Sequence, residues 1–99
     1  MSLYTFPEKH PNDELDYAVD FSDYITDSDT ISSCSVVASS GLTVGSGLKE
    51  PGISGDSVVF WLSGGESGVT YYITVSIVTA SGRTKVIEGS IVVMDPSPL

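Results

Sequence analysis

One stretch, Val69–Thr79, constrains the fold more than any other part of the chain. Eight of its eleven residues are Val, Ile or Thr and two more are Tyr, types that pack well on a pleated sheet. Apolar residues occupy alternate positions, so one face can be buried while the other stays half exposed. Glycine-rich turns flank the stretch at residues 64–68 and 81–82. The sequence therefore predicts a long central β-strand, with a bend or bulge because few strands are that long.

Five further segments have the composition of strands. They cover residues 15–21, 31–38, 41–44, 57–62 and 84–93. In the first of them, Leu15, Tyr17, Val19 and Phe21 are expected to point inward. In the second, Ile31 is out of phase with Cys34 and Val36, which either a β-bulge or a later start of the strand would correct. Six strands joined by Gly- and Ser-rich turns predict an all-β, antiparallel β-sandwich of about six to seven strands, and a barrel is the competing architecture.

The remaining segments lie outside these strands. We expect residues 1–14 to form an N-terminal arm that is extended or partly disordered in isolation, and residues 15–94 to form the domain. Residues 95–99, with two prolines, read as a C-terminal tail. The segment 45–56 has four glycines in twelve residues, so it is expected to be the longest irregular loop and the most mobile. In the connection before the second strand, Tyr24 and Ile25 are expected to contact the core.

The charge balance and the single cysteine exclude several kinds of function. Thirteen acidic residues against four basic ones give a net charge of -9, which disfavours nucleic acids and acidic membranes and suits a basic partner surface. Cys34 alone cannot form an internal disulfide or a cysteine-based zinc site, which favours a reducing cytosol. The sequence has no signal-peptide pattern and no apolar run of transmembrane length. We expect a soluble protein made in the cytoplasm.

No residue pattern supports an enzyme or a cofactor site. Asp23, Asp27 and Asp29 share a loop and are calcium candidates, but the EF-hand spacing fails and a solvated acidic loop is favoured. His10 lies in the arm without a G-x-S-x-G motif to supply a nucleophile. The glycines around Ser46 lack the rest of a phosphate-loop motif. The prediction is therefore no catalytic, metal or cofactor-binding residue, with Cys34 as a small core residue.

Three aromatic residues form the sharpest candidate for a ligand site. Trp61, Tyr71 and Tyr72 lie on neighbouring predicted strands and would stack on a sugar if they faced one surface. Because strands of a sandwich pack together, a place in the core or in a protein interface is favoured. A carbohydrate-binding module stays as an alternative.

Several stretches together resemble one family of small tailed-bacteriophage virion proteins. Residues 9–22 (KHPNDELDYAVDFS) resemble its K-D-P-D-E-x-L-D-Y-x-x-D-W-S opening, with Phe21 in place of the usual Trp. The segments DTI (29–31), GLTV (41–44), VFWLSGG (59–65) and TASGRT (79–84) are similar to its other elements, and the loop 45–56 is longer than in the family. Members are described as fibre-tail adaptors or as virion proteins of unassigned role. The resemblance implies an immunoglobulin-like sandwich.

The resemblance also implies a function. We expect a non-enzymatic structural protein of the virion, made in the host cytoplasm, that joins tail and fibres by docking to other virion proteins in a symmetric, multi-copy assembly. A capsid decoration or head-tail accessory protein is the alternative within the virion. The predicted interface residues lie in the arm and in the long loop, and they are Tyr4, Phe6, Pro7, Leu48, Lys49, Pro51 and Ile53.

Overall fold

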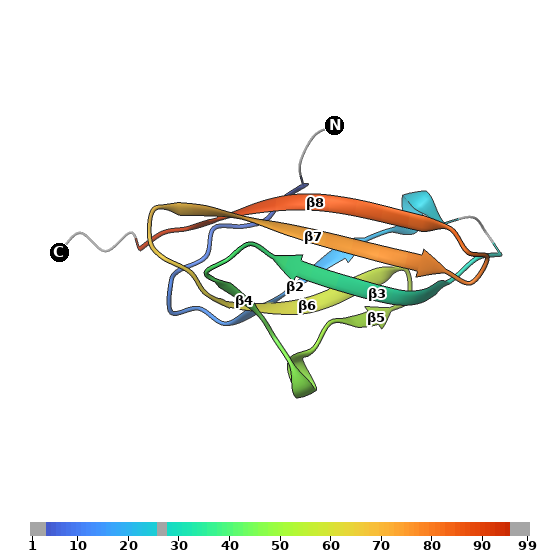
Figure 1. The fold of residues 1–99 in the computed structure, drawn as a ribbon, viewed down its shortest axis with the longest axis horizontal. Coiled ribbons are helices and arrows are strands. Elements are labelled where there is room, and N and C mark those ends of the chain that lie inside the picture. Colours follow the sequence, from blue (N-terminus) through green and yellow to red (C-terminus); the bar gives the residue numbers. More distant parts are fainter. Residues whose placement is uncertain (1–3, 26–27, 96–99) are drawn as a thin grey trace.

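Two β-sheets packed face to face make up the protein in a computed structural model that describes residues 4–25 and 28–95 (Figure 1). The first, here called the β7 sheet, has the strand order β1 (Tyr4–Thr5), β8 (Thr84–Val93), β7 (Val69–Thr79) and β3 (Ile31–Ala38). In the second, the β6 sheet, β2 (Leu15–Asp20) pairs with one edge of β6 (Ser57–Gly64), and β4 (Leu42–Val44) and β5 (Gly52–Ser54) pair with the other. Two short 3-10 turns are η1 (Ser22–Tyr24) and η2 (Gly47–Lys49).

The prediction of an all-β protein with two layers is confirmed. All strand pairs in the described residues are antiparallel except β1 with β8, which is parallel. The β7 sheet is therefore mixed, and the prediction of a purely antiparallel sandwich is wrong at this pair, because β1 runs alongside β8 in the same direction. The part of the chain that the structure describes contains no helix long and apolar enough to cross a membrane.

The long strand β7 has the predicted alternation, and of the bend or bulge expected within it, its pairing with β8 shows no bulge. Its register with β8 runs without a break from Val69, opposite Val93, to Val78, opposite Thr84. The irregularity lies in the neighbouring strand, where the register of β3 with β7 shifts between Ile31 and Ser33. An interruption within β7 would turn the following side chains to the other face, whereas the shift in β3 brings Ile31 into the core. The bulge predicted for that strand is thus confirmed.

The core lies between the two sheets. From β7 it takes every second residue from Tyr71 to Ile77. Its other buried hydrophobic members are Phe6, Val19, Phe21, Ile31, Leu42, Val58, Phe60, Leu62, Ile91 and Val93. Leu15, expected to point inward, is 44% exposed. It stands at the first position of β2, an edge strand, where less of the opposite sheet covers it.

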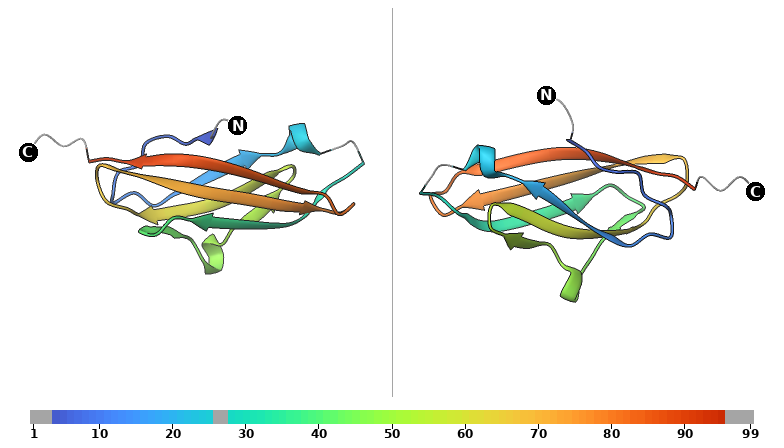
Figure 2. Two further views of the ribbon diagram at one scale, coloured as in Figure 1. Left: turned by 45° about the horizontal axis from the view of Figure 1, so that its top comes forward. Right: turned by 180° about the vertical axis from the view of Figure 1, so that it is seen from behind.

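The segment 45–56 is more ordered than the expected irregular loop. After η2 the chain returns to the β6 sheet as β5, which pairs with residues 57–59 of β6. A two-residue turn at Gly55 and Asp56 connects the two strands, and Gly55 has the positive φ of 59° that suits glycine in a tight hairpin. Residues 45–51 leave the sheet between β4 and β5, and η2 projects from the same side of the sandwich on which β3 is outermost (Figures 1 and 2).

Candidate docking sites

The N-terminal segment packs along the edge of β8. The backbone N–H of Phe6 donates to the carbonyl of Ser90 at 2.9 Å, and Lys9 donates in the same way to Val92 at 2.9 Å. The Phe6 ring is 5% exposed and meets the rings of Tyr17 and Phe60 edge-on, with centroids 5.7 and 5.8 Å away. Of the two expectations for this segment, extended or partly disordered, the structure has residues 4–9 extended along β8, with Phe6 completing the core.

A glycine on β8 makes room for this packing. A Cβ at Gly89 would lie 2.5 Å from Cε2 of Phe6 and 2.9 Å from the carbonyl oxygen of Tyr4. A Cβ atom is essentially never this close to another heavy atom, so any larger residue at position 89 would displace the arm. Of the three interface residues predicted in the arm, Phe6 is thus buried, whereas Tyr4 and Pro7 are exposed.

Lys9 is the second anchor of the arm, and the sequence analysis did not identify it. Its side chain is fully buried, and its Nζ donates to the carbonyls of Gly64 at 2.6 Å and His10 at 2.9 Å. Burial lowers the pKa of the Lys9 amine, while the negative charge of Asp13 acts in the opposite direction. A buried lysine with backbone partners ties the arm to the turn between β6 and β7. The burial of Lys9 follows no sequence periodicity, so no local pattern predicts it.

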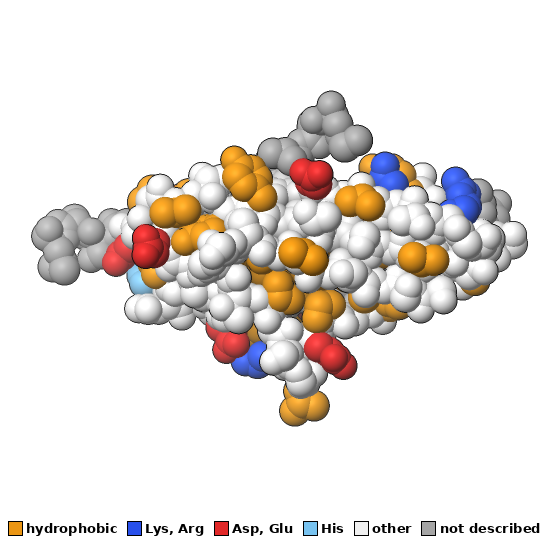
Figure 3. Space-filling model, viewed as in Figure 1, with side chains coloured by type: hydrophobic (Ala, Val, Ile, Leu, Met, Phe, Trp, Pro, Cys, Tyr) orange, Lys and Arg blue, Asp and Glu red, His pale blue; other side chains and the backbone are white. Residues whose placement is uncertain are grey.

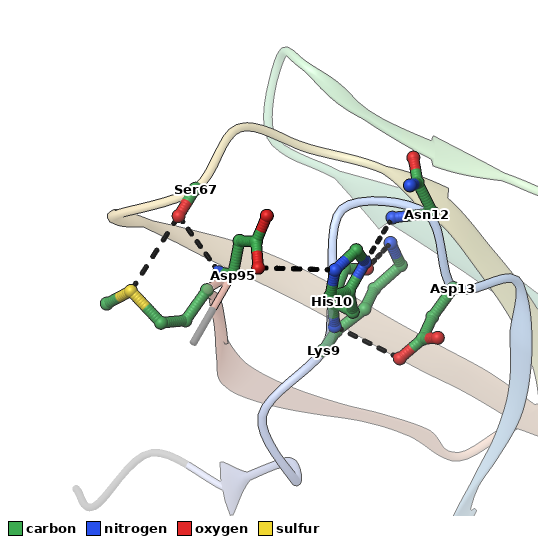
Figure 4. A network of polar contacts seen from close by, with 7 residues as sticks. Lys9, His10, Asn12, Asp13, Ser67 and Asp95 are labelled. Atoms are coloured by element: carbon green, nitrogen blue, oxygen red, sulfur yellow. Dashed lines mark hydrogen bonds and ion pairs between the residues drawn. The ribbon is translucent and has the colours of Figure 1, made fainter. Parts of the chain in front are cut away.

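His10 has a structural place beside this anchor (Figure 4). Its Nδ1 accepts the backbone N–H of Asn12 at 3.0 Å, and its Nε2 lies 3.5 Å from Oδ1 of Asp95. Its own backbone N–H donates to Asp13 Oδ2 at 3.0 Å. These contacts join the end of the arm to the segment that follows β8.

The turn η2 forms a fixed projection. The N–H of Gly45 donates to the carbonyl of Trp61 at 2.9 Å, and the Lys49 amine lies over the Trp61 ring, 4.9 Å from its centroid. The same amine donates to Oε1 of Glu14 at 2.8 Å. A Cβ at Gly45 would lie 2.5 Å from the carbonyl oxygen of Lys49. The backbone at residue 45 is therefore too close to the backbone at Lys49 for a larger side chain. These contacts hold both sides of the turn.

Leu48 stands at the end of this projection and is fully exposed. Figure 3 shows a hydrophobic group at the tip, with acidic side chains on both sides of its base. Pro51 is half-buried and Ile53 is 42% exposed. Of the predicted interface residues in this loop, Leu48, Lys49 and Pro51 lie on the projection, whereas Ile53 lies on β5 in the β6 sheet. Leu48 is the most accessible of them.

The outer face of the β7 sheet differs in charge from that of the β6 sheet. It bears hydroxyl and aliphatic side chains and one charged residue, Glu88 (Figure 3). The exposed hydrophobic residues on it are Val37, Tyr72, Val78, Val86 and Val92. The β6 sheet instead presents Asp16 and Asp20 on β2. In a chain of net charge -9, the β7 sheet thus has an unusually neutral surface.

The acidic loop does not form a calcium site in the described residues. Oδ2 of Asp29 accepts the Ser81 hydroxyl at 2.6 Å, and Oδ1 accepts the N–H groups of Thr30 and Ser81. The hydroxyls of Ser81 and Thr79 hold the pKa of Asp29 down at about 2. Asp27 lies outside the described residues, and no group of three His, Cys, Asp or Glu among those described is placed to bind a metal. Asp29 thus connects two loops of the fold.

The three candidate sugar-stacking rings lie in three different places, two on opposite outer faces and one in the core. Trp61 is half-buried on the outer side of the β6 sheet beneath Lys49, while Tyr72 is exposed on the outer side of the β7 sheet. Tyr71 is buried, and its hydroxyl accepts the N–H of Glu66 at 2.8 Å. No common platform forms, because alternation along β7 sends adjacent tyrosines to opposite faces.

Two smaller predictions concern Cys34 and the loop after β2. Cys34 is half-buried against the core, and burial raises the pKa of its thiol, so it is a poor nucleophile. Ile25 packs against the core as expected. Tyr24 is 45% exposed and lies beside Phe21 and under the Lys85 amine, which is 4.3 Å from its ring centroid.

Comparison with known proteins matches this structure to one family. The family model described as podophage GP4 fiber-tail adaptor protein gp77 matches residues 9–93, which include Lys9, η2 and every strand from β2 to β8. A search among curated proteins gave no match. The family is structural and non-enzymatic, and its members are components of the phage tail and hence of the virion. The chain therefore belongs to the podophage fiber-tail adaptor family gp77, as its sequence motifs had indicated.

Proposed function

We propose that this adaptor engages one of its partners through the η2 projection, with Leu48 as the inserted side chain. The observation that carries the proposal is a fully exposed leucine on a turn held by Lys49, Gly45 and Trp61. A partner that binds a fixed turn orders few residues, so less of the interaction energy is lost to entropy. Lys49, Pro51 and Ile53 would form the rim of the contact.

The arm supplies a second, smaller surface. Tyr4 and Pro7 are exposed along β8, next to the neutral outer face of the β7 sheet. Phe6 joins an interface only if the arm leaves β8, since its ring is packed between Tyr17 and Phe60. Two separate surfaces suit an adaptor that must hold a tail protein and a fibre protein at once.

Substitution of Leu48 tests the proposal. Burying a leucine contributes about 1.5–3 kcal/mol, so Leu48→Ser is expected to weaken partner binding by about tenfold or more. The variant would be supplied to a phage that lacks the gene, and the copies of the chain per particle would be counted by quantitative mass spectrometry. Val69→Ser, at a 36% exposed aliphatic residue of β7, is the matched control. Full incorporation of Leu48→Ser would overturn the assignment.

We also propose that the sandwich is immunoglobulin-like. Two features of the strand order support this: β2, β6 and the β4–β5 pair follow the order of strands B, E and D, and β3, β7 and β8 follow that of C, F and G. In this reading β1 is an additional edge strand on β8. The division into an arm (1–14), a domain (15–94) and a tail (95–99) belongs to the same proposal.

We infer, finally, that several copies form a symmetric ring in the particle, since closed cyclic arrangements are the commonest way to assemble identical chains. Cryo-microscopy of the virion would count the copies and locate them. Density at the junction of tail and fibres supports the adaptor position, whereas density on the capsid or at the neck would support a decoration or head-tail accessory role.

A further inference from the structure

The sheet edges of this protein are protected to very different degrees. The arm covers part of β8, through β1 and through the backbone bonds of Phe6 and Lys9. β2 carries Asp16 and Asp20, and charged side chains oppose pairing with another chain. β4 and β5 have three residues each and are separated by the η2 projection. Among the described residues, β3 has neither a strand paired to its outer edge nor a charged side chain, although β5 of the opposite sheet lies close to it.

β3 is an eight-residue edge strand, ISSCSVVA, without a charge or a proline. Among the described residues it pairs only with β7. Its one irregularity, the bulge between Ile31 and Ser33, lies at its start. Natural edge strands of this length usually carry a lysine, a proline or a covering segment, because a bare edge is a template for another strand.

The pairing pattern identifies the backbone groups on this open edge. The N–H of Ser39 donates to the carbonyl of Tyr72, in register with the rest of the ladder. In an antiparallel pair the residues that bond to the partner alternate, so Val37, Ser35 and Ser33 direct their N–H and C=O groups to β7. Cys34, Val36 and Ala38 therefore direct theirs to the open side. These three alternate residues offer the N–H and C=O groups to which an added strand would hydrogen-bond.

Charge decides what kind of strand fits. A second copy of the chain would bring another net charge of -9 against acidic groups that flank the η2 projection on this side (Figures 1 and 3). The β3 edge itself is uncharged, and the β7 sheet beyond it has only Glu88 on its outer face. A neutral or basic extended segment of a different protein meets no such repulsion.

We propose that β3 accepts an extended, neutral or basic segment of another virion protein, which adds a fifth strand to the β7 sheet. The added strand lies on the side from which η2 projects, so the same partner contacts Leu48. This inference rests on the proposed function, since it names how the docked partner is held.

Hydrogen exchange tests the proposal at single amides. In the isolated chain the N–H groups of Cys34, Val36 and Ala38 should exchange freely, while those of Ser35 and Val37 are protected by β7. In purified virions the first three should slow by 100-fold or more. Fragmentation mass spectrometry on both samples, with the isolated chain at low and high concentration, gives the comparison.

Each result has a distinct meaning. Slow exchange in the isolated chain that appears as concentration rises would show β3 pairing between copies and overturn the assigned partner. Fast exchange at all three amides in particles that contain the chain would overturn the added strand but leave the adaptor function intact. Absence of the chain from purified particles would overturn both.

A pair of variants gives a second readout. Val37→Lys places a positive charge on the outer face at the edge strand, where Val37 is 61% exposed. Val86→Lys makes the same change on β8, at a 42% exposed residue of the same face. We expect Val37→Lys to fold normally and to lose incorporation into particles, while Val86→Lys retains it. Equal incorporation of the two variants would contradict the proposal.

Discussion

The docking of the arm can be measured through Phe6. The sequence alone suggested a loose arm, whereas the structure places the Phe6 ring in the core with 5% of its surface exposed. The two descriptions predict different costs for Phe6→Ala. A loose arm would make the substitution nearly silent, and a docked arm would make it one of the most damaging in the chain.

The expected cost follows from the contacts of the ring. Truncation of a buried phenylalanine typically costs about 3–5 kcal/mol in free energy of unfolding. The arm is a terminal segment, so it can detach from the domain when its docking energy is lost. The cost of the substitution therefore cannot exceed the free energy with which the arm docks. We therefore expect about 2–4 kcal/mol for Phe6→Ala. For a domain of this size that lowers the melting temperature by about 8 °C or more.

Urea denaturation, followed by Trp61 fluorescence and by circular dichroism, measures this cost. Tyr4→Ala is the control, because the Tyr4 ring is 44% exposed and its loss should cost under about 1 kcal/mol. A free-energy change below about 0.5 kcal/mol for Phe6→Ala would refute the docked arm.

Gly89→Ala provides an independent check from the other side of the contact. The new Cβ would meet Cε2 of Phe6 at 2.5 Å, so the substitution should destabilise the protein by displacing the ring. In the Phe6→Ala background that clash is removed, and the same substitution should cost much less. A coupling energy of about 1–3 kcal/mol is expected between the two sites, and additive effects would show that the ring does not lie against β8.

Two further predictions concern pH. Hydrogen bonds lower the pKa of the Asp29 carboxyl from 3.8 to about 2 in the folded chain. As the pH falls, the carboxyl is therefore protonated in the unfolded chain before it is protonated in the folded chain. The stability that Asp29 provides is complete above pH 4 and is lost as the pH falls towards 2. The melting temperature of the wild type should fall more steeply over that range than that of Asp29→Asn, and parallel curves would contradict this role. Burial lowers the pKa of the Lys9 amine in the folded chain below its ordinary value of 10.5. Between the folded and the unfolded pKa, the unfolded chain binds more protons than the folded chain, so stability rises with pH. The stability of the wild type relative to Lys9→Met, from urea curves at pH 7 to 10.5, should therefore increase, and a constant difference would show that the amine is not desolvated.

The sequence determined most of the strands, because alternation with a period of two is a local property. Residues 31–38, 69–79 and 84–93 form strands with the predicted bounds. The phase of Ile31 against Cys34 indicated either a bulge or a later start of the strand, and the structure has the bulge. The family motifs could also be read locally. The projecting loop was identified by its glycines, although the three-residue strand β5 is too short to leave a periodic signal.

The tertiary structure decided where the ends and the single aromatic and charged residues lie. Phe6 pairs with Ser90 and Lys9 bonds to Gly64, contacts between segments more than fifty residues apart, and no local pattern encodes them. The face on which Trp61 lies relative to Tyr72 depends on how the two sheets stack. The bare edge of β3 likewise exists only because β4 crosses to the other sheet and leaves that edge open. Local side-chain chemistry selects strands, but which groups are buried, paired or left exposed is set by the packing of the two sheets against each other.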